Sequence, residues 1–237
     1  MQIKTVLFDL DGTLLPMDQE LFVKDYLSRL AAYMVPYGYD PKKVTDAVME
    51  GVITMVRNDG SMSNEEAFWK CFAKHFGEDC IKDIPIFEEF YRTEFQKVKA
   101  SCGFNAEAKK VIELVKQRDM KAVLATNPLF PQIATYSRVR WAGLEPEDFE
   151  YITTYENNSC CKPNPKYYEE ILSKLNLKAD ECAMVGNDSK EDTVPSTMGI
   201  PVFLLTDCLI DKGGDISKFK HGGFDELKDF IDDLNKE

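Results

Sequence analysis

The sequence has few of the residues on which histidine and cysteine chemistry depends. Only two of its 237 residues are histidines, His75 and His221, which leave little material for a catalytic triad or a histidine-bound metal. Its seven cysteines are scattered and include no C-x-x-C pair, so neither a zinc site nor a disulfide framework is expected. Such cysteine usage is typical of reduced thiols and predicts a cytoplasmic protein. Carboxylates are therefore the abundant reactive groups of this chain.

Positive charge is also scarce. Lysine and arginine total 29 against 41 aspartates and glutamates, which gives a net charge of −12. Nucleic acids and anionic lipids are held through lysine and arginine, so neither is expected as a partner. No apolar run approaches the roughly 20 residues that cross a bilayer, and acidic residues follow the N-terminus too soon for a signal peptide. The sequence leaves the oligomeric state open.

Several familiar site motifs are absent. No G-x-x-x-x-G-K-[ST] stretch occurs, which excludes a nucleotide-binding P-loop, and no G-x-S-x-G stretch provides a nucleophile elbow. The acidic segment that starts at Asp9 does not form a calcium-binding loop, because Leu14 stands where that loop requires glycine.

What is present is the composition of a folded protein, with 44% hydrophobic and 30% charged residues. Short apolar segments predict strands, and amphipathic segments between the later ones predict helices. Such alternation indicates an α/β fold, with a Rossmann-like parallel sheet that carries helices on both faces. The predicted strands are residues 3–8, 120–126, 151–154, 183–185 and 202–205. The predicted helices are one capped by Asn105, one opened by Pro128, one from Pro165 to about Asn176 and a closing one over 224–234.

Helical patterns alone occupy residues 15–100. Four apolar stripes are expected there, including one after the pair Asp40-Pro41, one that begins at a capping box formed by Ser63 and Glu66, and a fourth from Phe87 to Val98. We therefore expect a discontinuous catalytic core, residues 1–14 and 101–237, interrupted by an all-helical cap. Because ligands of such sheets bind at the carboxyl ends of the strands, an insertion directly after the first strand is placed to cover the site.

Polar residues follow three of the predicted strands. They are Asp9 and Asp11, then Thr126 and Asn127, then Asn187 and Asp188, while Lys162 lies in a loop after a fourth strand. Taken singly, each has a plain structural explanation. Thr126-Asn127 could cap a helix opened by Pro128, and Lys162 could be a solvated loop lysine. Taken together, they are expected to meet at one edge of one sheet.

A site of this composition favours phosphoryl chemistry. Carboxylates brought together repel one another unless a cation joins them. Oxygen donors without histidine or cysteine suit a hard divalent ion, so Mg²⁺ is the expected cofactor. A metal, a lysine and a hydroxyl together can hold a phosphoryl group, and a carboxylate can attack phosphorus to form an aspartyl-phosphate.

Four segments carry a family resemblance. D-L-D-G-T-L at 9–14, T-N at 126–127, K-P-N-P at 162–165 and G-N-D-S-K-E-D at 186–192 resemble, in order, the four motifs of the haloacid dehalogenase superfamily. The insertion resembles, in position and helical character, the C1 cap of the branch that contains phosphoglycolate phosphatase and β-phosphoglucomutase. The resemblance implies a phosphoric monoester hydrolase that acts on a small phosphorylated metabolite.

The resemblance also implies a role for each motif residue. Asp9 would be the nucleophile and Asp11 the general acid and base. Thr126, Asn127 and Lys162 would hold the phosphoryl group. Mg²⁺ would bind the Asp9 carboxylate, the Asp11 backbone carbonyl and Asp188. Asp192 would either be a further metal ligand or anchor Lys162, while Asn187 departs from the Gly-Asp or Asp-Asp that family members more often carry.

Other interpretations remain at this point. A phosphosugar mutase would transfer the same aspartyl-phosphate to a second hydroxyl, and a non-catalytic phosphate-binding or receiver-like module would use similar residues. An acid at position 11 disfavours a dehalogenase, whose leaving group needs no proton. Substrate specificity is expected from the cap, where the loop 57–61 could reach the site through Arg57 or be a plain turn between helices. Cys160 and Cys161 could make activity sensitive to oxidation or be small buried side chains.

Overall fold

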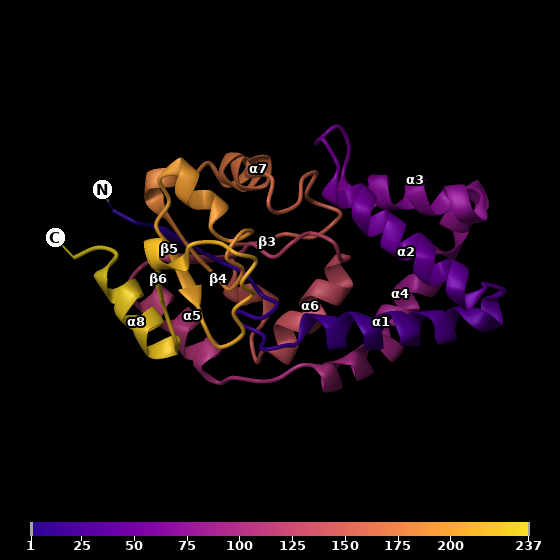
Figure 1. Ribbon diagram of the computed structural model, residues 1–237, viewed down its shortest axis with the longest axis horizontal. Coiled ribbons are helices and arrows are strands. Elements are labelled where there is room, and N and C mark those ends of the chain that lie inside the picture. Colours follow the sequence, from indigo (N-terminus) through magenta and orange to yellow (C-terminus); the bar gives the residue numbers. More distant parts are fainter. Residues whose placement is uncertain (1, 237) are drawn as a thin grey trace.

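A six-stranded parallel sheet forms one end of the molecule. The computed structural model describes residues 2–236, and the sheet has the order β3-β2-β1-β4-β5-β6 (Figure 1). The strands are β1 (Thr5–Phe8), β2 (Lys121–Leu124), β3 (Tyr151–Ile152), β4 (Cys182–Gly186), β5 (Val202–Leu205) and β6 (Lys220–Gly222). The parallel α/β sheet predicted from the sequence is confirmed.

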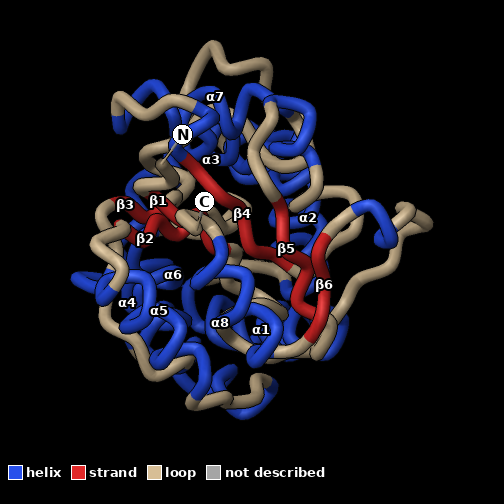
Figure 2. Tube along the Cα trace, turned by 90° about the vertical axis from the view of Figure 1, so that its left-hand side faces the viewer, coloured by secondary structure: helices blue, strands red, loops and turns tan. Residues whose placement is uncertain are grey.

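Helices cover both faces of this sheet, because its central strands are apolar on both sides. Val6 and Phe8 of β1 pack with α5 (Glu107–Gln117), α6 (Gln132–Trp141) and α8 (Phe224–Asp233), whereas Leu7 faces α7 (Pro165–Leu175). Figure 2 shows the strands between α7 on one side and the other three helices on the opposite side. Successive residues of a strand thus pack into two different hydrophobic cores, one on each face of the sheet.

The chain between β1 and α5 is helical. It contains α1 (Gln19–Met34), α2 (Pro41–Val56), α3 (Asn64–Phe76) and α4 (Ile84–Arg92), which lie at the far end from α8 in Figure 1. The side chains of Asp18 and Asp40 cap α1 and α2, and Ser63 with Glu66 forms the predicted capping box of α3. The interior of this helical segment is aromatic, with Trp69 edge-on to Phe87 at 5.3 Å between ring centroids.

The fourth predicted stripe, from Phe87 to Val98, is not one helix. α4 ends at Arg92, and Glu94–Ser101 continues as a 3-10 helix. The break is at Thr93, whose hydroxyl donates a hydrogen bond of 2.7 Å to the carbonyl of Glu89 and whose backbone leaves the helical region. The buried side chains Phe95 and Val98 still join the same core.

Two other sequence predictions were wrong. Pro128 does not open a helix, because α6 begins at Gln132 after the cap residue Pro131. The sheet also has a strand beyond β5, since β6 pairs with it in parallel. β6 carries Lys220 and His221, both exposed, so this edge strand shows no apolar pattern in the sequence. No helix in residues 2–236 is long and apolar enough to span a membrane.

Candidate functional site

The carboxyl ends of β1, β2 and β4 meet at one cavity of about 210 Å³. β1 lies between β2 and β4, so the loops that follow these three strands are neighbours in space. The cavity is lined by all the residues that the motifs singled out, namely Asp9, Asp11, Thr126, Asn127, Lys162, Asn187, Asp188 and Asp192. The structure therefore brings together all the motif residues that were candidates for the site.

Lys162 lies at the centre of this cluster and is 2% exposed. Its Nζ donates to Oδ1 of Asp9 at 2.8 Å and to Oδ1 of Asp192 at 2.6 Å. Burial disfavours the charge of the ammonium, but the carboxylates of Asp192 and Asp9 outweigh it and hold the pKa of Lys162 well above its ordinary value. The alternative of a solvated loop lysine is excluded by this burial.

Asp9 follows β1 directly and is 7% exposed. Its Oδ2 accepts a hydrogen bond of 3.2 Å from the hydroxyl of Thr13, a residue that the sequence interpretation left without a role. Burial raises the pKa of Asp9 to about 7; Lys162 opposes this rise and the charges of Asp192 and Asp11 add to it.

Asp192 is bound through both of its carboxylate oxygens. Oδ1 accepts from Lys162, and Oδ2 accepts from the backbone N–H groups of Asn187 and Asp188, each at 2.9 Å. A Cβ atom on Gly186 would lie 2.2 Å from the carboxyl carbon of Asp192, so only glycine allows this approach. Asp192 thus joins Lys162 to the loop after β4.

Asp188 faces a different cation. Its Oδ1 accepts from the backbone N–H groups of Lys190 and Glu191, at 2.8 and 2.9 Å, and its Oδ2 lies 2.6 Å from Nζ of Lys212. Lys212 also contacts Oε1 of Glu191 at 2.8 Å. Lys212 belongs to no motif and was missed by sequence reasoning, because only the fold brings its loop beside β4.

Asp11 pairs with a second residue that the sequence interpretation missed. The guanidinium of Arg138, on α6, contacts Oδ2 of Asp11 and lies 4.5 Å from the ring centroid of Phe130. Arg138 is fully buried, while Oδ1 of Asp11 is buried with no hydrogen-bond partner in the described chain. Arg138 lies on the inward side of α6 with Ala134 and Trp141, so an arginine on an otherwise buried helix stripe was the available signal.

The two asparagines of the cavity connect loops. Oδ1 of Asn127 accepts from the backbone N–H of Lys162 at 3.2 Å, so Asn127 does not cap a helix. Nδ2 of Asn187 donates to the carbonyl of Cys208 at 2.7 Å. Gly12, with a φ of +90°, packs against Asn187, where a Cβ atom would lie 2.2 Å from Nδ2. Thr126 is 1% exposed, and its carbonyl accepts from the hydroxyl of Tyr167 at 2.8 Å.

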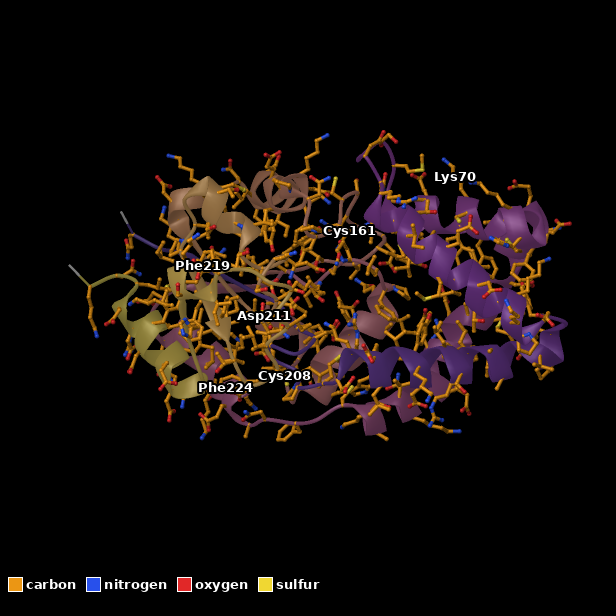
Figure 3. The ribbon with its side chains drawn as sticks, viewed as in Figure 1. Lys70, Cys161, Cys208, Asp211, Phe219 and Phe224 are labelled. Carbon is orange, nitrogen blue, oxygen red and sulfur yellow. The ribbon has the colours of Figure 1, made fainter. Side chains whose placement is uncertain are left out.

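Residues 57–61 line neither this cavity nor the larger one beside it. Asn58 instead donates to Oδ1 of Asn64 at 2.9 Å. Asn64 in turn donates to Sγ of Cys161 at 3.3 Å, and Figure 3 shows Cys161 between the sheet and the helices α2 and α3. Burial raises the pKa of the Cys161 thiol to about 12, which disfavours the reactive thiolate. Loop 57–61 is thus linked through Asn58 and Asn64 to Cys161, and it has a structural role outside the cavity.

The oxygen donors around the cavity suit a hard cation. Within residues 2–236, no three side chains of His, Cys, Asp or Glu gather as a ready metal cluster. The carboxylates face protein cations instead: Asp9 and Asp192 share Lys162, Asp11 faces Arg138 and Asp188 faces Lys212. The carboxylates of Asp9 and Asp188, and a lining without histidine or cysteine, fit a divalent ion such as Mg²⁺.

Known sequences resemble this chain over most of its length. The family model for haloacid dehalogenase-like hydrolase matches residues 3–193. The pyrophosphatase PpaX of Halalkalibacterium halodurans is 24% identical over 191 residues, which are 81% of this chain and 78% of that protein.

Solved structures share the fold. A HAD phosphatase from Thermococcus onnurineus superposes with a TM-score of 0.60 at 18% identity, over 97% of this chain and 98% of the other. A predicted phosphoglycolate phosphatase from Haemophilus somnus superposes with a TM-score of 0.59 at 14% identity, over the same shares of the two chains.

Proposed function

Since the chain belongs to the haloacid dehalogenase-like hydrolases, as its motifs indicated, we propose that it is a Mg²⁺-dependent phosphatase that hydrolyses a small phosphorylated metabolite through an aspartyl-phosphate on Asp9. The observation that carries this proposal is the convergence of Asp9, Lys162 and Asp192 with Asp11 and Asp188 on one cavity. The names of its relatives, a pyrophosphatase and two phosphatases, support phosphoryl transfer.

In the first half of the reaction, a carboxylate oxygen of Asp9 attacks phosphorus and the bond from phosphorus to the leaving oxygen breaks. Asp11, in its protonated form, gives its proton to that oxygen. Lys162, held beside Asp9 at 2.8 Å, neutralises charge on the phosphoryl oxygens, and the buried Thr126 offers its hydroxyl to them.

In the second half, water attacks the aspartyl-phosphate. The Asp11 carboxylate takes a proton from the water, the bond between phosphorus and Asp9 breaks, and phosphate leaves. Asp192 takes no part in bond changes: it holds Lys162 at 2.6 Å and the amides of the loop after β4, so we assign it as an anchor.

Asp9, the Asp11 backbone carbonyl and Asp188 would hold Mg²⁺. The ion would supply charge neutralisation for the phosphoryl group and would let carboxylates share one site. Residues 1–14 and 101–237 would form the catalytic core, with residues 15–100 as the cap. The seven free cysteines are consistent with a reducing cytoplasm.

The test is turnover of p-nitrophenyl phosphate by the purified protein. Asp9→Asn should lower kcat by roughly 10³-fold or more while the circular dichroism spectrum stays unchanged. Asp207→Asn, at an exposed position, is the matched control. EDTA should abolish turnover and Mg²⁺ should restore it. Unchanged turnover in Asp9→Asn would refute the nucleophile, and turnover that resists EDTA would refute the metal requirement.

A further inference from the structure

A second cavity, of about 350 Å³, lies between the helical segment and the chain after β2. A cavity of this volume holds a ring with a short side chain. Its walls come from α1, α2, α3 and α4 and from residues 129–133 and 155–156. Most of the lining is apolar or aromatic, and includes Tyr26, Leu30, Val52, Phe68, Trp69 and Tyr91.

This second cavity, called the cap cavity below, adjoins the cavity that contains Asp9 and Lys162, called the catalytic cavity. Val23, Leu129 and Phe130 line both of them. Phe130 also lies against the guanidinium of Arg138, which pairs with Asp11. The boundary between the two cavities is therefore next to the carboxylate that would protonate the leaving oxygen. A group bonded to that oxygen has the cap cavity as its neighbouring apolar space.

The charged residues of the cap cavity are mostly acidic. Glu65, Glu88 and Glu156 line it, with Arg92 as the only basic side chain of the lining. Arg92 pairs with Glu88 at 3.0 Å. Glu156 accepts hydrogen bonds from the backbone N–H of Gln132 at 2.8 and 3.1 Å. Two of the three carboxylates are thus already engaged by the protein.

Glu65 is the exception. It is half-buried at the start of α3, and no hydrogen bond or ion pair within the described chain engages its carboxylate. Burial raises the pKa of Glu65, and the nearby charges of Glu156, Glu66 and Glu88 add to this rise. A half-buried carboxylate without a partner carries a desolvation cost that a bound cation or hydrogen-bond donor would offset.

We propose that the cap cavity binds the leaving group of the substrate, and that this leaving group is an apolar or aromatic body bearing a positively charged nitrogen that pairs with Glu65. The proposal rests on the proposed phosphatase function and names its substrate class. The cavity's apolar walls bind the body of the leaving group, and Glu65 selects its charge.

The charge is tested with two substrates of similar size. Tyramine O-phosphate carries an ammonium group, and the phosphate ester of 3-(4-hydroxyphenyl)propionate carries a carboxylate at the corresponding end. We expect kcat/KM to be at least about tenfold higher for the amine, and Glu65→Gln to reduce this preference severalfold. Glu89→Gln removes the same charge from the helical segment at a residue outside the cavity lining and should keep the preference.

The location is tested by filling the cavity. Val52→Trp should lower kcat/KM for tyramine O-phosphate at least about tenfold more than it lowers that for acetyl phosphate, whose acetyl group is too short to reach the cap cavity. Ile53→Trp, on the exposed side of the same helix, should affect neither substrate. Glu65→Gln conserves the side-chain volume. Its effect on the preference for the amine therefore still tests whether the leaving group reaches this cavity, even if tryptophan at position 52 perturbs folding.

The outcomes separate the two proposals. If acetyl phosphate and both aryl esters are inert with the wild-type protein and Mg²⁺, the phosphatase function itself is refuted. If acetyl phosphate is hydrolysed but the amine and carboxylate esters react within twofold of each other, the phosphatase stands and the charge selection by Glu65 is refuted. If Val52→Trp affects all three substrates equally in a folded protein, the leaving group does not bind in the cap cavity.

Discussion

The guanidinium of Arg138 contacts the carboxylate of Asp11 from a fully buried position on α6. One oxygen of Asp11 is held by this contact, while the other is buried without a hydrogen-bond partner among residues 2–236. A general acid works only when its proton is within reach of the leaving oxygen, so fixing its carboxylate has a direct effect on rate. In the proposed mechanism, where Asp11 is the general acid, Arg138 would be a positioning residue that acts on the substrate through Asp11.

We therefore expect Arg138→Met to lower kcat roughly tenfold or more while KM changes less than about threefold. Steady-state kinetics measures kcat and KM.

Arg140→Met provides the matched control. Arg140 is two residues away on the same helix and contacts Glu145 at 3.2 Å near the surface. It should leave kcat and KM unchanged. An Arg138→Met protein that keeps the wild-type kcat would show that the buried arginine is structural only.

Lys212 gives a second prediction, because its ammonium contacts Asp188 at 2.6 Å, where Mg²⁺ would bind. Burial lowers the pKa of Lys212, but hydrogen bonds to Asp188 and Glu191 more than compensate, so the lysine stays charged and would compete with the ion. Lys212→Met should strengthen Mg²⁺ binding by about three- to tenfold. Isothermal titration calorimetry with Mg²⁺ alone measures this without any turnover.

The control is Lys218→Met, which removes the same charge from an exposed residue that contacts Asp215 at 3.4 Å. It should not change the dissociation constant for Mg²⁺. Equal or weaker Mg²⁺ binding by Lys212→Met would mean that the ion does not displace this lysine.

The motif residues could be predicted from the sequence because the geometry of a parallel sheet fixes where the end of each strand lies. Asp9, Thr126 and Asp188 follow three adjacent strands, and the carboxyl ends of such strands share one edge. The positions of the cations that face Asp11 and Asp188 could not be predicted in the same way. Arg138 reaches Asp11 from the middle of a helix, and Lys212 reaches Asp188 from a loop whose path depends on the whole fold.

Two wrong predictions of secondary structure also have physical reasons. β6 was missed because an exposed edge strand with Lys220 and His221 carries no apolar alternation. Pro128 was taken as a helix start, although Asn127 before it is used to bind the backbone of Lys162. A local capping pattern and a tertiary contact have the same sequence signature here, and only the fold distinguishes them.

Gly186 gives a third prediction, since its missing side chain lets Asp192 approach the loop after β4. Gly186→Ala places a methyl group where the carboxyl group of Asp192 lies, so Asp192 must move and Lys162 loses one of its two partners. We expect kcat to fall by about tenfold or more and the midpoint of thermal unfolding to decrease. Gly214→Ala is the comparison, because its Cβ would also clash, at 2.5 Å from the carbonyl of Ser189, but away from Lys162. If both variants lose stability and kcat alike, the loss at Gly186 is not specific to Asp192.

The pKa of Asp9 makes stability depend on pH in the metal-free protein. Asp9 has an ordinary pKa of 3.8 and a pKa of about 7 when folded, chiefly because of burial. Between these values the folded protein keeps a proton that the unfolded chain releases. The stabilisation linked to this proton is therefore fully present below about pH 4 and is lost as pH rises through 7.

Asp9→Asn removes this titration. The free energy of unfolding of the variant minus that of the wild type should increase as pH rises from 4 to 8, by about 4 kcal/mol at most, and then level off. Urea unfolding in EDTA at several pH values measures the difference, while Asp207→Asn should differ from the wild type by less than about 0.5 kcal/mol throughout. A difference that stays constant from pH 4 to 9 would show that Asp9 is charged in the folded protein over this whole range, so that Lys162 outweighs the effect of burial.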